Sequence, residues 1–317
     1  MTKVIKTTPK KAYDKLSPKM NTEQKEDFKK ILKWSKEVNI FLDNVKNKIK
    51  NNDVCPIERL DNWVTLVCRY PAYKWQIVEF EWEKYYIVKD KEDLNYELIK
   101  FFDKRKDKFE LNYIITSFIT DMSELFIYYN KFNENISNWD TSNVINMSKM
   151  FIWCKYFNQP IWNWNLSKVK DTSLMFQDTK EFNQSIWNWN ISNLENMYWM
   201  FLNAESFNQP IWNWNTKNVK NMQWIFKNAK SFNQPIWNWD ISNITNMYEM
   251  FKWASSFNQP IWNWNTSNVT NMSEMFDWAE SFNQDISKWN VNNIEYNEGF
   301  DEHSNKEWKK EFKPKFK

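Results

Sequence analysis

Hydrophobic and polar positions recur along this chain with a period of 25 residues. Apolar side chains hold five positions of the period, and Asn, Ser, Thr and Asp dominate between them. The first series is Phe126, Phe151, Phe176, Phe201, Phe226, Phe251 and Phe276. The second is Phe132, Phe157, Phe182, Phe207, Phe232, Phe257 and Phe282. The third is Ile136, Ile161, Ile186, Ile211, Ile236, Ile261 and Ile286. The fourth is Trp139, Trp164, Trp189, Trp214, Trp239, Trp264 and Trp289, and Val144, Val169, Leu194, Val219, Ile244 and Val269 form the fifth. Seven copies without insertion or deletion therefore fill residues 116–290.

Each copy predicts one short helix. In residues 266–290, apolar side chains follow Asn271 with the spacing i, i+3, i+4, i+7, which is typical of one face of a helix. These side chains are Met272, Met275, Phe276 and Ala279. Asn271 precedes them as an N-cap would, and every other copy has Asn or Asp at that position.

Each copy also predicts one short strand. Residues 159–164 are rich in Ile and Trp and begin near Pro160, where a strand tolerates the missing N–H. The polar residues 165–168 then supply a turn. One strand and one helix in every copy predict an α/β repeat solenoid, leucine-rich-repeat-like, with one short parallel strand per coil. A single unit buries too little apolar surface to offset the entropy of ordering it, so stability has to come from stacking.

The flanking segments complete a four-part domain organisation. Residues 1–20 are predicted to be a mobile basic tail, and residues 21–115 an α+β N-terminal domain that includes the cap of the solenoid. Within that domain, residues 21–50 predict an amphipathic helix, residues 75–88 show a strand-like alternation, and residues 91–103 predict a second helix. Residues 116–290 are the seven repeats.

Residues 291–317 are interpreted as a degenerate repeat and C-terminal cap, with Asn297 in place of the repeat's Met. Trp308 and Phe312 stand one helical turn apart among lysines. A capping helix explains this pattern, and a basic-aromatic contact with a membrane or nucleic acid is the alternative.

Charge and composition exclude several classes of function. The net charge is +3 for the whole chain and −3 for the repeats, with 12 Lys+Arg against 15 Asp+Glu, the reverse of a nucleic-acid-binding footprint. One His and one Gly supply neither a catalytic triad nor a phosphate-binding loop. Cys55, Cys68 and Cys154 have no zinc-ligand spacing and predict no disulfide framework. We therefore expect no enzyme activity, no catalytic residues, no cofactor and no metal.

A second tryptophan series is the candidate ligand- or partner-binding site. It consists of Trp162, Trp187, Trp212, Trp237 and Trp262. Strand alternation predicts that Trp162 points with Trp164 and away from Ile161. The two end copies have Ser137 and Ser287 at this position, which favours a partly exposed ladder over a core position. The alternative is that the end copies are merely atypical. Asn158 and its equivalents are predicted to form a hydrogen-bond ladder that satisfies turn backbone.

The repeat resembles a known family. Residues 250–272 follow the pattern MF-x2-A-x2-FNQ-x-I-x2-WN-x-SNV-x-NM, which is similar to that of the BspA-like leucine-rich-repeat surface proteins with a mycoplasma-type 25-residue repeat of unknown function. The resemblance covers residues 116–290 and implies proteins at the cell surface, or secreted, that adhere to hosts or vary antigenically. The sequence starts without a signal peptide, which by itself predicts a cytoplasmic protein. No stretch has the length of a transmembrane span.

These patterns predict a non-enzymatic solenoid for protein–protein interaction or adhesion, with a protein partner that the resemblance suggests is host-derived. Two alternatives remain at this stage. One is a carbohydrate-binding module that uses the exposed Trp ladder. The other is an antigenic or spacer repeat without a defined ligand. No nucleic-acid partner is expected.

Overall fold

The computed structural model describes residues 57–59, 66–68, 77–80, 83–103 and 110–317. The chain divides into two units, Met1–Pro56 and Ile57–Lys317. The predicted basic tail and the helix expected over residues 21–50 lie outside the described residues.

The described elements before the repeats are short strands, one α-helix and a 3-10 turn. β1 (Ile57–Arg59) pairs antiparallel with β2 (Leu66–Cys68). β3 (Ile77–Phe80) and β4 (Glu83–Ile87) form an antiparallel hairpin, and β5 (Ile114–Ile115) adds to β4 in parallel. The alternation over residues 75–88, predicted as strand, is thus two paired strands in which Phe80 faces Glu83.

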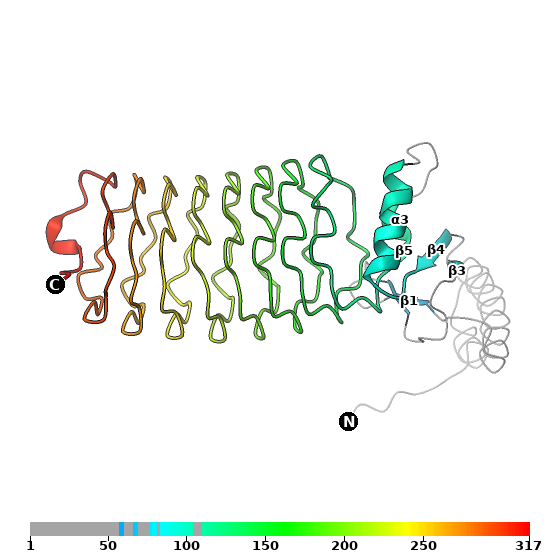
Figure 1. Cartoon of the computed structure of the whole chain (residues 1–317), viewed down its shortest axis with the longest axis horizontal. Coiled ribbons are helices and arrows are strands. Elements are labelled where there is room, and N and C mark those ends of the chain that lie inside the picture. Colours follow the sequence, from blue (N-terminus) through cyan, green and yellow to red (C-terminus); the bar gives the residue numbers. More distant parts are fainter. Residues whose placement is uncertain (1–56, 60–65, 69–76, 81–82, 104–109) are drawn as a thin grey trace, which may run out of the picture. The chain divides into compact units, whose positions relative to one another are not determined.

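The helix predicted over residues 91–103 is α3 (Lys91–Asp103). Leu94 and Leu98 are buried in the same apolar core as the first repeat, and the ring of Phe102 stacks on Tyr129 at 3.8 Å between centroids. Ile99, on the same helix, is 49% exposed. A 3-10 turn (η3, Leu111–Tyr113) then leads into β5. Figure 1 shows α3 beside the first coils.

Cys68 is disulfide-bonded, against the expectation of no disulfide. The spacing of three cysteines in sequence did not indicate this bond, because a disulfide depends on distance in space. Cys154 is a free and buried thiol, and burial raises its pKa, in keeping with the small buried residue of the repeat pattern.

From residue 116 onward the chain winds into coils that lie side by side (Figure 1). Equivalent residues of neighbouring coils form isolated parallel bridges. The bridged pairs are Asp121–Asn146, Asn146–Asp171, Asp171–Asn196, Asn196–Asn221, Asn246–Asn271 and Asn271–Tyr296. The two partners of every pair are one sequence period apart, so one period makes one coil.

Within the coils, the helix and strand predicted for each copy are absent. Residues 272–279 form a series of turns, and residues 159–164 form no strand. The hydrogen bonds explain the first difference: Met275, Asp277 and Ala279 each donate an N–H to the carbonyl three residues earlier, whereas an α-helix uses the residue four earlier. The positions predicted as N-caps carry the parallel bridges. Their side chains still behave as caps do, because Asn271 Oδ1 accepts the N–H of Ser273 at 2.9 Å.

Residues with a left-handed backbone conformation recur at fixed positions in the turns. Thirteen non-glycine residues have φ between 51° and 64°, in two series that recur once per period, and Gly299 continues the first series with φ 62°. A left-handed conformation costs a non-glycine residue about 1–2 kcal/mol. In twelve of the thirteen, the N–H donates to a carbonyl of the following coil at 2.7–3.2 Å. The strained conformation is therefore what directs the N–H across to the next coil.

These bonds connect peptide groups into continuous rows. The N–H of Met122 donates to the carbonyl of Asn146, and the N–H of Met147 donates to the carbonyl of Asp171. The Asn146 carbonyl and the Met147 N–H belong to one peptide group, so the row continues from coil to coil as far as the carbonyl of Asn221 and resumes at Met247. Parallel rows begin at Glu124, Phe126 and Trp153. Every N–H in these rows points toward the following coil.

Two phenylalanine stacks fill the centre. The rings of the Phe126 series lie 5.4–5.8 Å apart between coils, with interplanar angles of 6–14°. The Phe132 series stacks at 5.6–6.0 Å. None of these rings is more than 2% exposed. Because fully burying a Phe contributes about 1.5–3 kcal/mol, each of these rings contributes substantially to the stability of the stack.

The C-terminal segment covers the last Phe rings. Trp308 is 3% exposed, and its ring packs edge-on against Phe276 and Phe282. Its Nε1 donates to the carbonyl of Gln284 at 2.9 Å. The local structure is a 3-10 turn, η4 (Lys310–Phe312), in place of the expected longer helix. The burial of Trp308 fits the capping interpretation of this segment rather than an exposed basic-aromatic contact.

Removal of one full period should preserve the fold. A chain lacking residues 191–215 keeps every row in register and loses one interface between coils, so we expect a cooperative thermal transition at a modestly lower temperature. A chain lacking residues 191–203 breaks the register and should lose the transition. Circular-dichroism melts compare the two. Similar melts for both deletions would contradict the stacked arrangement.

Candidate functional site

The tryptophans of the second series stand at the corner of a tight turn in each coil. The N–H of Trp164 donates to the carbonyl of Ile161 at 3.2 Å, and both of these side chains are buried. Trp162, between them, is 41% exposed. The equivalent side chains Trp187, Trp212, Trp237 and Trp262 are 53%, 49%, 48% and 61% exposed. We call these five residues the tryptophan strip.

The prediction that Trp162 points with Trp164 was wrong in its geometry. It assumed a strand, in which alternate residues share a face. In the turn that forms instead, the first and last residues point into the core, and Trp162 points outward. The exposure that the end copies suggested is nevertheless observed at all five positions.

Side chains of the buried tryptophan series donate hydrogen bonds to the backbone of these turns. Trp189 Nε1 donates to the carbonyl of Ile161 in the preceding coil at 3.0 Å, and the same bond recurs at Trp214, Trp239, Trp264 and Trp289. Asn263 Nδ2 donates to the carbonyl of Trp237 at 2.7 Å. The backbone that carries the strip is therefore fixed before any ligand arrives.

The predicted Asn ladder is confirmed and borders the same segment. Asn133 Oδ1 accepts the N–H of Asn158 at 2.9 Å, and Asn158 Oδ1 accepts the N–H of Asn183 at 3.0 Å. The bond repeats through the later coils to Asn283. The next residue in each coil, such as Gln159, donates from Nε2 to the same Oδ1. The ladder satisfies backbone groups just before the strip.

Serine copies show that the turn does not require tryptophan. At the strip position, Ser137 and Ser287 stand in turns closed by the same hydrogen bond, which measures 3.1 Å in both. The framework therefore folds equally with a small polar residue. Exposing five indoles to water is unfavourable, and the fold does not require them at these positions.

The spacing along the strip follows from the core. Neighbouring coils are 5.4–6.0 Å apart at the Phe rings. Four such steps separate Trp162 from Trp262, so the strip extends over roughly 22–24 Å.

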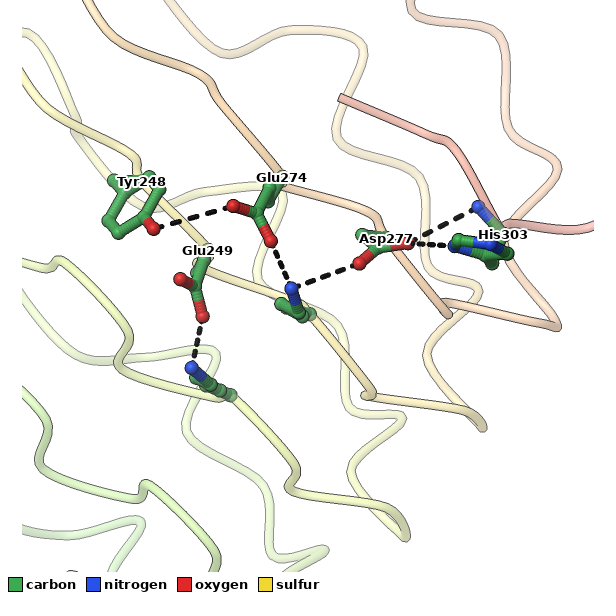
Figure 2. Close-up of polar contacts among 7 residues, drawn as sticks. Tyr248, Glu249, Glu274, Asp277 and His303 are labelled. Carbon is green, nitrogen blue, oxygen red and sulfur yellow. Dashed lines mark hydrogen bonds and ion pairs between the residues drawn. The ribbon is translucent and has the colours of Figure 1, made fainter. Parts of the chain in front are cut away.

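The structure also reveals a polar network that the sequence analysis did not identify (Figure 2). Asp277, 5% exposed, accepts Lys252 Nζ at 3.0 Å and pairs with His303 Nδ1 at 2.8 Å. Lys252 also pairs with Glu274, whose other oxygen accepts the Tyr248 hydroxyl at 3.4 Å. Glu249, 6% exposed, pairs with Lys227. These seven residues come from four successive coils and are called the charge network.

The pKa values of the network reflect competing effects. Burial raises the pKa of Asp277, but hydrogen bonds from His303 and Lys252 and the charge of Lys252 outweigh it, so the pKa lies below its ordinary value. Glu249 follows the same pattern, with the lowering of its pKa due to Lys227 and Tyr248. Burial lowers the pKa of Lys252, yet Glu274 and Asp277 raise it above its usual range. The buried carboxylates and the ammonium group are thus mutually stabilised in their charged forms.

A signal for this network was present in the sequence. Its residues occupy positions at which the copies differ, and a repeat pattern is defined by the positions at which they agree. Within the described stretches, no helix has both the length and the apolar character that a membrane crossing requires. The same stretches contain no group of three or more His, Cys, Asp or Glu side chains placed to hold a metal ion.

Comparison with known proteins gives one match. A family model described as "Mycoplasma protein of unknown function, DUF285" matches residues 96–214 and, a second time, residues 195–310. Together the matches cover residues 96–310, more than half of the chain. No curated protein and no solved structure matches it.

Removing one carboxylate of the charge network should lower the free energy of unfolding. Asp277→Asn leaves Lys252 with Glu274 as its carboxylate partner and removes the carboxylate that contacts His303, so we expect about 2 kcal/mol of destabilisation at pH 7. Because the folded pKa of Asp277 lies below the ordinary 3.8, its stabilisation is present above that value and is lost as pH falls through the folded pKa. The variant should therefore lose less stability than the wild type on acidification below about pH 4. Chemical denaturation between neutral and acid pH measures both effects.

A matched control replaces both partners by the residue that another coil uses there. Leu202 occupies the equivalent position, so Lys252→Leu combined with Asp277→Leu should recover most of the loss. A double variant less stable than Asp277→Asn would contradict this account.

Proposed function

The chain belongs to this family of Mycoplasma proteins of unknown function, and from that premise we propose that it is a non-enzymatic repeat solenoid that binds a protein partner through the tryptophan strip. The observation that carries the proposal is the equivalence of Ser137 and Ser287 with the five tryptophans. The same turn forms with either residue, so the indoles are available for a task other than folding.

The physical properties of the strip support a role in recognition. Tryptophan supplies a large, rigid contact area, and tryptophan is enriched among the residues that dominate binding energy at interfaces. The strip lies on a preformed backbone, so little conformational entropy is lost when a partner binds. Adhesion through repeated weak contacts also gains from multivalency, since five equivalent sites act on one surface.

The resemblance to surface proteins favours a host-derived partner and a location at the cell surface or outside the cell, and the proposal includes both. The two overlapping matches of one family model are compatible with a domain built for interaction.

Substitution of the central tryptophans tests the proposal. Trp187→Ser, Trp212→Ser and Trp237→Ser together should abolish binding to immobilised extracellular-matrix proteins, measured by biolayer interferometry on a panel that includes collagen, laminin and fibronectin. The circular-dichroism spectrum should not change, because the end copies already fold with serine. Truncation of such anchors typically costs about 2 kcal/mol or more each.

Three exposed tryptophans outside the strip provide the matched control. Trp153, Trp253 and Trp278 are 50%, 40% and 43% exposed. Their combined change to Ser removes the same number of indoles and should leave this binding intact. Equal loss in both triple variants, or no binding of the wild type to any protein in the panel, would count against a protein partner at the strip.

A linear glycan is the second candidate, because equal spacing of identical indoles fits a ligand that itself repeats. Sugar rings pack on aromatic faces, and each added unit would engage a further coil. Affinity for an oligosaccharide series on a glycan array should then rise with chain length up to about five units and fall in the Trp187, Trp212 and Trp237 variant. An array without length-dependent binding would eliminate this candidate.

A further inference from the structure

The coils contain a second surface on which the set of residues varies from coil to coil. Each coil follows the pattern N-M-x-x-M-F-x-x-A with few departures, and the combination of residues at the four x positions differs in every copy. They read SK and IW after Asn146, YW and LN after Asn196, and SE and DW after Asn271. We call these positions the variable face. Its residues include the left-handed positions of the turns, from which Trp153, Trp253 and Trp278 project with 40–50% of their surface exposed.

Variation within one chain separates what the fold needs from what it tolerates. All copies share one backbone, so a position that packing determines keeps its residue, as the Phe series do. The position of Lys252 holds Ile152, Gln177, Leu202, Lys227 and Asp277 in other coils. Ile152 and Leu202 are 4% and 7% exposed there, so an apolar residue satisfies the framework.

The charges of the last coils are therefore an addition that the framework does not demand. Glu249 and Asp277 are only 6% and 5% exposed, and desolvation of such groups is costly even when they are paired. Residues placed at a cost to stability, where apolar ones would serve, point to recognition of something outside the coil.

The sign of the charge identifies the chemistry of the partner. On the variable face after residue 225, the acidic side chains are Glu249, Glu274, Asp277, Glu298 and Glu302. Lys227 and Lys252 are the basic ones, so five minus two leaves a net charge of −3 with His303 neutral. The whole chain carries +3. The negative charge is therefore confined to this part of the surface. Glu298 and Glu302 are both exposed.

Aromatic rings beside these carboxylates add a second means of binding a cation. The Nζ atoms of Lys252 and Lys227 lie 4.9 and 5.1 Å from the Trp253 ring centroid, so the protein's own side chains already use this indole in cation–π contacts. Trp278, one coil further, stacks on His303 at 4.5 Å and remains 43% exposed. Carboxylates and indoles together suit lysine and arginine side chains.

We propose that the variable face of the last coils, from Trp253 to Glu302, binds a polypeptide segment rich in lysine or arginine. The exposed carboxylates attract the segment, and the indoles of Trp253 and Trp278 receive its cationic side chains. The buried charge network holds Glu274 and Asp277 in place. This surface is separate from the tryptophan strip and does not depend on its function.

Binding of fluorescein-labelled octalysine to the full-length chain, followed by anisotropy, tests the proposal. Octalysine should bind at about 50 mM salt and weaken at about 300 mM, because the contacts are mainly electrostatic. Octaglutamate of equal length should not bind. Glu298→Lys combined with Glu302→Lys should weaken octalysine binding at least about tenfold, as reversal of charges at an interface does.

The matched control is Glu134→Lys combined with Glu181→Lys, which changes the net charge equally at exposed positions in the early coils, outside the variable face. It should bind octalysine within about twofold of the wild type, since distant charges are screened. The Trp187, Trp212 and Trp237 variant should also bind it normally, which keeps this test independent of the strip. Equal weakening in both glutamate variants, loss of binding in the strip variant, or absence of octalysine binding by the wild type would each overturn the proposal.

Discussion

The hydrogen bonds between successive coils are the constraint on which the rest of the structure depends. Alternate N–H groups in the turns of each coil reach a carbonyl of the following coil, and they do so because residues such as Glu124 and Trp153 adopt a left-handed conformation. One inserted residue would displace every donor from its acceptor. The strict period of the sequence and the stacked Phe rings both follow from this requirement, since equal translation of the backbone brings equivalent side chains face to face.

Sequence patterns predicted the period, the capping behaviour of Asn271 and its equivalents, the Asn158 ladder and the helix over residues 91–103. They did not predict the conformation inside each coil. The spacing i, i+3, i+4, i+7 fits an α-helix and also fits a series of three-residue turns, because both bring those side chains to one side. Nothing in a Trp, Leu or Glu indicates a positive φ, which glycine normally signals.

The candidate sites show the same division. The exposure of the Trp162 series could be predicted from the copies that have serine at this position. The direction in which its side chains point could not, because it depends on a turn that the sequence pattern did not predict. The charge network was missed because the residue type at its positions changes from copy to copy, as from Lys252 to Asp277. A repeat is recognised by its constant positions. In this chain the charged residues of the network lie at the positions where the copies differ.

The aligned rows of peptide groups have an electrical consequence. Each peptide carries a dipole of about 3.5 D, and dipoles arranged head to tail add, as they do in an α-helix. In the rows that begin at Met122, Glu124, Phe126 and Trp153, the N–H groups point toward the C-terminal end, and the opposing bonds, such as those of Lys170 and Ser206, are fewer in each coil. The last coil is therefore the positive pole of the stack and the first coil the negative pole. Lys91 lies at the first coil, 2.7 Å from Ser123 Oγ, and the carboxylates of Glu274, Asp277 and Glu298 gather at the last. The backbone itself thus polarises the stack of coils along its axis and stabilises carboxylates such as Glu298 in the last coil.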